Sequence, residues 1–233
     1  MDSDDLEERL KTPNNFSKLR KNIGLEHANT AYTSGNNLYE QGKYKEAIKC
    51  YDLAIELNPK FLESYFNRAL SYYNLGDYNN ALSDYTKAIE IDPFNPLIYN
   101  NRGDALYRQQ KFDLAILDYT QATKLNPDYL KAYYNRGLAY ACTERYNQAI
   151  EDFTKTTSLN PKFAEGYNAQ GLTYQYLDDY KNAIKFHQKA IELDADFLES
   201  WNNLGECYKM LNKTEEAVGC FEKVISLAKK NDK

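Results

Sequence analysis

Apolar side chains along this chain recur at the spacing of amphipathic helices. In residues 62–95 two such stripes follow each other, the first with Tyr65, Ala69, Tyr72 and Tyr73 and the second with Ala81, Leu82, Tyr85, Ala88 and Ile89. Gly76 and Asp77 lie between the stripes and are typical of a turn. Pro93 ends the second stripe because a proline ring clashes with the preceding helical turn and lacks a backbone donor. The pattern predicts two helices joined by a turn.

The whole pattern returns every 34 residues. One alanine of the second helix stands at Ala47, Ala81, Ala115, Ala149, Ala183 and Ala217. A small residue of the first helix stands at Gly35, Ala69, Gly103, Gly137, Gly171 and Gly205. A period of this length marks a stacked-repeat architecture. We therefore divide the chain into six copies, residues 28–61, 62–95, 96–129, 130–163, 164–197 and 198–229.

This combination of residues resembles the tetratricopeptide repeat family, and the resemblance covers roughly residues 28–230. It implies an all-α fold, an α-solenoid with a right-handed superhelix, built from six helix–turn–helix repeats. It also implies that the first helix of each copy lines a concave inner surface. The apolar pattern agrees, since no copy can bury its own stripe and neighbours must stack.

The two ends of the chain fall outside the copies. Residues 1–27 form an acidic segment, in which Phe16, Leu19, Ile23 and Leu25 favour a short helix over residues 16–27. Such a helix would cover the open edge of the first copy, as terminal repeats require. Residues 230–233 are read as a short basic tail.

Composition narrows the class of protein. The formal net charge of −5 and the pI of about 5.3 argue against general nucleic-acid binding, which needs a basic face. No apolar run reaches the length of a membrane span, so no membrane insertion is expected. The N-terminus lacks the apolar core of a secretory signal. We expect an intracellular, cytoplasmic protein, in the cytosol or associated with the cytoskeleton or a cilium, and not a secreted one.

Groups that carry out catalysis are scarce. The chain has two histidines: His187 stands at a position that is aromatic in the other copies, and His27 lies at the entry to the first copy. No phosphate-binding loop, nucleophile elbow or metalloprotease motif is present. The four cysteines are widely spaced without a CxxC pair, which favours buried reduced thiols. We predict no enzyme activity, no cofactor and no metal.

Three copies combine an arginine on the first helix with an aspartate on the second, namely Arg68 with Asp84, Arg102 with Asp118 and Arg136 with Asp152. The remaining copies lack both residues; the sixth has Leu204 and Cys220. Residues that change together indicate contact. We interpret them as structural ion pairs between the two helices, with an anion-binding row of arginines as the alternative.

Asparagines and aromatic residues recur on the predicted inner surface. We predict a partner-binding groove formed by Asn36, Tyr39, Phe66, Asn67, Tyr73, Asn101, Tyr107, Tyr134, Asn135 and Asn203. A row of asparagines can donate to and accept from a peptide backbone, and it looks like the asparagine ladder in the repeat region of the O-linked N-acetylglucosamine transferases. Alternatively, the asparagines satisfy local polar needs on a solvated face, and some of the aromatic residues pack under neighbouring segments.

Three functions follow from this pattern. The leading one is a non-catalytic adaptor or scaffold that binds an extended or helical segment of a partner protein in the groove. The second is a structural subunit of a large cytoskeletal or ciliary assembly, docked by its outer faces or ends. The third is a co-chaperone that binds the acidic tails of heat-shock chaperones. It is disfavoured because Tyr32, Leu97 and Asn101 stand where the family's clamp has its three cations.

Overall fold

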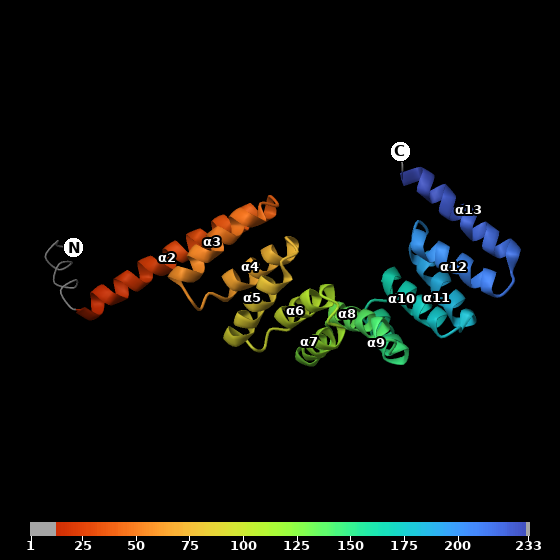
Figure 1. The fold of residues 1–233 in the computed structure, drawn as a ribbon, viewed down its shortest axis with the longest axis horizontal. Coiled ribbons are helices and arrows are strands. Elements are labelled where there is room, and N and C mark those ends of the chain that lie inside the picture. The colour runs from red at the N-terminus through yellow and green to blue at the C-terminus, as the bar shows by residue number, and fades with distance from the viewer. Residues whose placement is uncertain (1–12, 232–233) are drawn as a thin grey trace. The chain divides into compact units, whose positions relative to one another are not determined.

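The computed structural model describes the backbone of residues 13–231 and the side chains of residues 22–230. This part of the chain contains twelve α-helices and no strand (Figure 1). The predicted all-α fold of helix–turn–helix repeats is confirmed. Residues 1–12 of the acidic segment lie outside the described residues.

The chain divides into two compact units, and the boundary between them along the sequence falls between Gln109 and Gln110, inside the third predicted copy. The N-terminal unit contains α2 (Pro13–Glu40), α3 (Tyr44–Leu57), α4 (Leu62–Asn74), α5 (Tyr78–Ile91) and α6 (Pro96–Arg108). The C-terminal unit contains α7 (Phe112–Leu125), α8 (Leu130–Cys142), α9 (Tyr146–Leu159), α10 (Ala164–Tyr176), α11 (Tyr180–Leu193), α12 (Leu198–Met210) and α13 (Thr214–Asn231). Within each unit every helix packs against the next one along the chain, so apolar stripes are buried between neighbours.

The turn from the first to the second helix of each copy closes on a residue with left-handed backbone. These residues are Gly42, Gly76, Gln110, Glu144, Asp178 and Asn212, with φ between 56° and 77°. Glycine adopts this conformation without strain, whereas the other four residues carry a cost of about 1 kcal/mol. A left-handed residue therefore stands at the same position of the turn in all six copies, whatever its side chain.

A ring on the second helix lies directly on the backbone of a glycine in the first. A Cβ atom added to Gly35, Gly137 or Gly171 would lie 2.6 Å from the ring of Tyr51, Phe153 or His187, respectively. These three rings are almost fully buried. Ala69 and Tyr85 hold the same two positions in α4 and α5, so one methyl group is tolerated in that copy. The small residue sets how closely the two helices of a copy approach.

Helix α2 differs from our expectation. We expected a separate short helix over residues 16–27, but α2 runs without a break from Pro13 to Glu40 and includes the first helix of copy one. No proline follows Pro13 in this stretch to end a helix near His27. At the other end, α13 extends to Asn231, so Lys230 belongs to a helix and not to a tail; its Nζ donates to Asp196 Oδ2 at 2.8 Å.

The structure forms two of the three predicted arginine–aspartate pairs, one in each unit. Arg68 Nε and Nη2 donate to the two carboxylate oxygens of Asp84, both at 2.7 Å, and Nη1 donates to Asp52 at 2.5 Å. Arg136 makes the equivalent bidentate contact with Asp152 at 2.8 and 2.7 Å.

The arginine side chains in these pairs are 16–18% exposed and the partner Asp84 and Asp152 side chains 6%. Burial lowers the pKa of Arg68, but the hydrogen bonds and charge of Asp84 outweigh burial and raise it, so the guanidinium stays charged. Arg102 and Asp118 belong to different units, and their pairing stays a prediction.

Removing one residue of the Arg136–Asp152 pair should lower the free energy of unfolding far more than replacing both residues. Arg136→Ala leaves the Asp152 carboxylate buried without a counter-ion, which we expect to lower the free energy of unfolding by about 3–5 kcal/mol. Arg136→Leu combined with Asp152→Cys reproduces the residues of the sixth copy, Leu204 and Cys220, and should cost less than half of that. Urea unfolding of the full chain, followed by circular dichroism, measures both. Equal losses in the two variants would show that the charges do not depend on each other.

Candidate functional site

All ten predicted groove residues are half-buried and lie on the first helix of a copy. Seven belong to the N-terminal unit, on α2, α4 and α6, and three to the C-terminal unit, on α8 and α12. We call these half-buried positions the first-helix surface, and each unit carries its own part of it. Each of these side chains therefore contacts the protein and also keeps some exposed surface.

In the N-terminal unit the structure joins two of the predicted asparagines. Asn67 Nδ2 donates to Asn36 Oδ1 at 2.9 Å and to the hydroxyl of Tyr32 at 3.2 Å. The hydroxyl of buried Tyr51 donates to the same Asn36 oxygen at 2.8 Å, and burial raises the pKa of Tyr51, so that proton stays in place. Among the residues described, Asn36 Nδ2 and Asn67 Oδ1 have no protein partner. One donor and one acceptor thus remain side by side.

The C-terminal unit has a similar pair, formed by Asn203, which we predicted, and Asn168, which we did not. In the period of 34 residues Asn168 stands at the position of Tyr32 and not of Asn36. Asn203 Nδ2 donates to Asn168 Oδ1 at 3.3 Å, and Ser200 Oγ donates to the same oxygen at 2.9 Å. His187 Nδ1 lies 3.0 Å from it and must be the protonated nitrogen, because an amide oxygen only accepts. Asn168 Nδ2 and Asn203 Oδ1 have no partner in the part of the chain described. We noted His187 at an otherwise aromatic position in the sequence but did not connect it with Asn168.

The predicted aromatic residues pack partly against the core. The ring of Phe66 lies 5.8 Å from that of Tyr85, and the ring of Tyr73 lies 5.4 Å from that of Tyr78. The hydroxyl of Tyr39 accepts from Asn74 Nδ2 at 2.9 Å. These contacts hold each ring in one orientation, so its exposed side is a rigid apolar surface.

The remaining predicted residues are less informative. Tyr134 lies 5.2 Å from Phe163 in an edge-to-face contact, and burial raises the pKa of its hydroxyl. Asn101 Oδ1 accepts a weak 3.5 Å bond from Asn100. Tyr107 and Asn135 are half-buried on α6 and α8.

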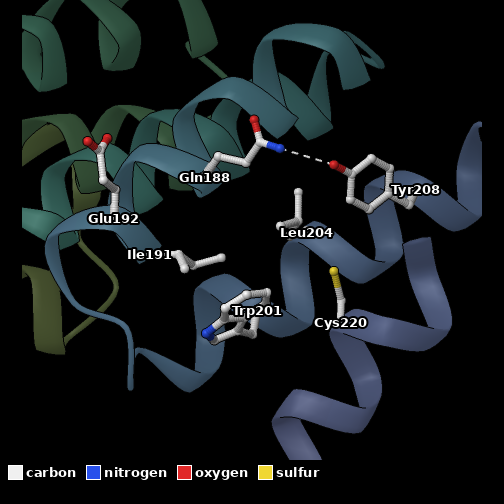
Figure 2. Close-up of a pocket in the computed structure, with 7 residues that line it drawn as sticks. All are labelled: Gln188, Ile191, Glu192, Trp201, Leu204, Tyr208 and Cys220. Atoms are coloured by element: carbon white, nitrogen blue, oxygen red, sulfur yellow. Dashed lines mark hydrogen bonds between the residues drawn. The ribbon is translucent and has the colours of Figure 1, made fainter.

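Sequence reasoning missed two pockets in the C-terminal unit. One, of about 400 Å³, lies where α11, α12 and α13 meet and is lined by Gln188, Ile191, Glu192, Trp201, Leu204, Tyr208 and Cys220 (Figure 2). The other, of about 510 Å³, lies over α10 and α11 and shares Gln188 and Glu192 with the first. Burial raises the pKa of the Cys220 thiol, so it contributes an uncharged, apolar wall to the first pocket.

The described residues hold no group of three histidine, cysteine or acidic side chains placed to bind a metal ion. In the same residues no helix combines the length and the apolar character that crossing a bilayer requires.

Comparison with known sequences decides the family. A model described as TPR repeat matches residues 35–76, 69–110 and 103–141, and models described as Tetratricopeptide repeat match residues 130–163 and 163–230. The chain belongs to the tetratricopeptide repeat family. A curated relative of this TPR chain is Hsp70-Hsp90 organizing protein 1 of Glycine max, 39% identical over 69 residues. That match spans 27% of the TPR chain and 12% of the relative, so the two proteins share only a short region.

Solved structures of similar fold agree. MamA is 27% identical to the TPR chain with a TM-score of 0.69, over 73% of this chain and 93% of MamA. YrrB, described as a TPR protein with an unusual peptide-binding site, is 23% identical with a TM-score of 0.65, over 73% of this chain and 88% of YrrB. PilF of Pseudomonas aeruginosa is 20% identical with a TM-score of 0.73, over 87% of this chain and 92% of PilF. The last two similarities show the fold alone.

Buried His187 should make the TPR chain sensitive to acid. Burial lowers the pKa of His187 from 6.5 to about 4, and its Nε2 has no hydrogen-bond partner among the described residues. The unfolded chain therefore binds a proton below pH 6.5 that the folded chain excludes until about pH 4. The contribution of neutral His187 to the free energy of unfolding is fully present above pH 6.5. It is lost as the pH falls through this window, by about 2 kcal/mol between pH 7 and pH 5. Urea unfolding midpoints of the full chain at the two pH values measure the loss.

The matched control for this measurement is His187→Phe, because Phe153 makes the same contact with its glycine. We expect this variant to lose clearly less stability than the unsubstituted chain over the same pH interval. Identical losses in the two proteins would exclude His187 as the titrating group.

Proposed function

We propose that this TPR chain is a non-catalytic adaptor that holds an extended segment of a partner protein against its first-helix surface. The observation that supports this most strongly is the pair of asparagines in each unit. Asn36 with Asn67, and Asn168 with Asn203, each leave an amide NH₂ group and an amide oxygen without a partner in the described part of the chain. A peptide unit offers one carbonyl and one N–H, which is the complementary set.

The asparagine pairs are oriented before any partner binds. Tyr51 donates from the core to Asn36, and His187 and Ser200 do the same for Asn168. A side chain held in place loses less conformational entropy on binding than a free one. Because the contact is with the main chain, an adaptor of this kind tolerates many partner sequences.

Aromatic side chains beside the pairs would supply contact area. Tyr39, Phe66 and Tyr73 lie in the same unit as Asn36 and Asn67, half-buried and fixed by neighbouring rings or amides. Tyrosine and phenylalanine contribute much buried area at a small entropic cost. We expect an isolated partner segment to bind with a dissociation constant of roughly micromolar size.

The co-chaperone function has less support. The relative from Glycine max is named for heat-shock chaperones, but this chain has Tyr32, Leu97 and Asn101 where the clamp for an acidic chaperone tail has cations. Asn36 and Asn67, which match the clamp's asparagines, bond to each other. A free carboxylate would meet no charge-assisted donor at these three positions.

Site-specific photo-crosslinking tests the adaptor function. A photoreactive phenylalanine at Tyr73 of the first-helix surface should crosslink a partner segment, while the same group at exposed Thr86 of α5 should not. The crosslinked segment is then made as a synthetic peptide and titrated. Asn67→Ala should weaken its binding about tenfold, because two hydrogen bonds are disturbed. Asn147→Ala, on the exposed side of α9, is the matched control and should leave affinity unchanged. Crosslinking only from Thr86, or equal affinities for both variants, would refute the proposal.

A further inference from the structure

The arginines of the ion pairs fill the groove between consecutive copies. Arg136 of α8 reaches Thr120 and Thr123 of α7 at 3.1 Å and Asp152 of α9 at 2.7 Å. Its guanidinium lies 5.4 Å above the ring of Tyr133. Arg68 lies in the same place in the N-terminal unit, between α3 and α5, and 5.6 Å above the ring of Tyr65. In these copies the groove is occupied by the chain itself.

The groove between α11, α12 and α13 has the same aromatic walls without the arginine. Trp201 and Tyr208 correspond in register to Tyr133 and Tyr140, but Leu204 stands in place of Arg136. Cys220 stands in place of Asp152, so this position carries no buried carboxylate that requires a counter-ion. Leucine is too short to fill the space, and the pocket of about 400 Å³ in Figure 2 remains. Leu204 and Cys220, 4% and 5% exposed, form its apolar floor.

A row of lysines runs along α11 beside this pocket. Lys181, Lys185 and Lys189 follow each other at intervals of four residues, which places them on one side of the helix. Lys185 and Lys189 line the second pocket, which shares Gln188 and Glu192 with the first. Glu192 contacts Lys189 at 2.8 Å, in an exposed pair of the kind that contributes little and is readily exchanged.

Only this copy has a lysine at all three positions, although α3 has Lys45 and Lys49 at the first two. The same three positions hold Asn147, Glu151 and Lys155 in α9, and Glu215, Gly219 and Lys223 in α13. The chain as a whole is acidic, with a net charge of −5. A positive row next to an open apolar pocket therefore distinguishes α11 and its neighbours from the other repeats, and opposite charge on a ligand would complement it.

We propose that this side of α11, α12 and α13 is a second docking site, for a short acidic segment of a partner protein. The segment places one apolar side chain in the pocket beside Trp201, where the other copies hold their own arginine. Its carboxylates lie along Lys181, Lys185 and Lys189. This site is separate from the first-helix surface and does not depend on the function proposed for that surface. A chain with two such sites can connect two partners.

The test starts from a library of random 12-residue peptides without tryptophan, selected on the immobilised full chain. We expect enriched peptides to carry two or more acidic residues within one helical turn of a leucine, isoleucine or phenylalanine. Trp201 is the only tryptophan of the protein, so its fluorescence reports directly on occupation of the pocket. Titration with an enriched peptide should shift the emission of Trp201.

Two variants and two controls decide between outcomes. Lys185→Glu with Lys189→Glu should weaken binding at least tenfold, and so should Leu204→Arg with Cys220→Asp, which rebuilds the arginine clamp of α8 and α9. Circular dichroism verifies that both variants fold. Lys155→Glu, at the position of α9 that corresponds to Lys189, and Asn203→Ala, on the first-helix surface, should leave binding unchanged. The proposal is overturned if no acidic peptide is enriched, if Trp201 does not respond, or if either double variant binds as tightly as the unsubstituted chain.

Discussion

The contact between a small residue on the first helix of a copy and a ring on its second helix governs the rest of this structure. The ring of Tyr51 on Gly35, of Phe153 on Gly137 and of His187 on Gly171 sets the separation of the paired helices. With that separation fixed, the other positions of the copy acquire definite roles. Some face the neighbouring copy and others face solvent.

The same ring also connects the core to the candidate binding surface. In two copies the ring carries a polar atom, the hydroxyl of Tyr51 or Nδ1 of His187, that donates to an asparagine oxygen on the first helix. The asparagine is thereby fixed and accepts a further bond from the asparagine of the next copy. The aromatic position therefore helps both to hold the helices together and to orient the amides. The hydroxyl of Tyr85, at the same position, has no hydrogen-bond partner among the described residues. Phe153 lacks a polar atom and therefore cannot donate to an asparagine in this way.

Much of this could be predicted from the sequence. Helices α4, α6, α8, α10 and α12 begin at Leu62, Pro96, Leu130, Ala164 and Leu198, the residues at which the period of 34 begins copies two to six. Periodicity predicts helix starts well because each copy ends in a similar loop. It failed for α2, since the repeat begins at Ala28 but no residue nearby interrupts a helix. The hydrogen bonds of Asn168 and the pocket beside Trp201 were also missed. Both depend on the size and direction of side chains, which a repeat pattern does not determine. In the sequence, Leu204 and Cys220 show that the ion pair is absent from the sixth copy, but they do not show that a pocket forms in its place.

The central claim is that paired asparagines bind the main chain of a partner. The most direct measurement replaces the amide bonds of a bound partner peptide with esters, one at a time, and records the affinity of each product. An ester removes one N–H donor and leaves the side chains unchanged. The account predicts a marked loss of affinity at the peptide unit beside Asn67 and no further loss there when the protein carries Asn67→Ala. Equal affinities along the whole ester series, with large effects only from side-chain changes in the peptide, would contradict it.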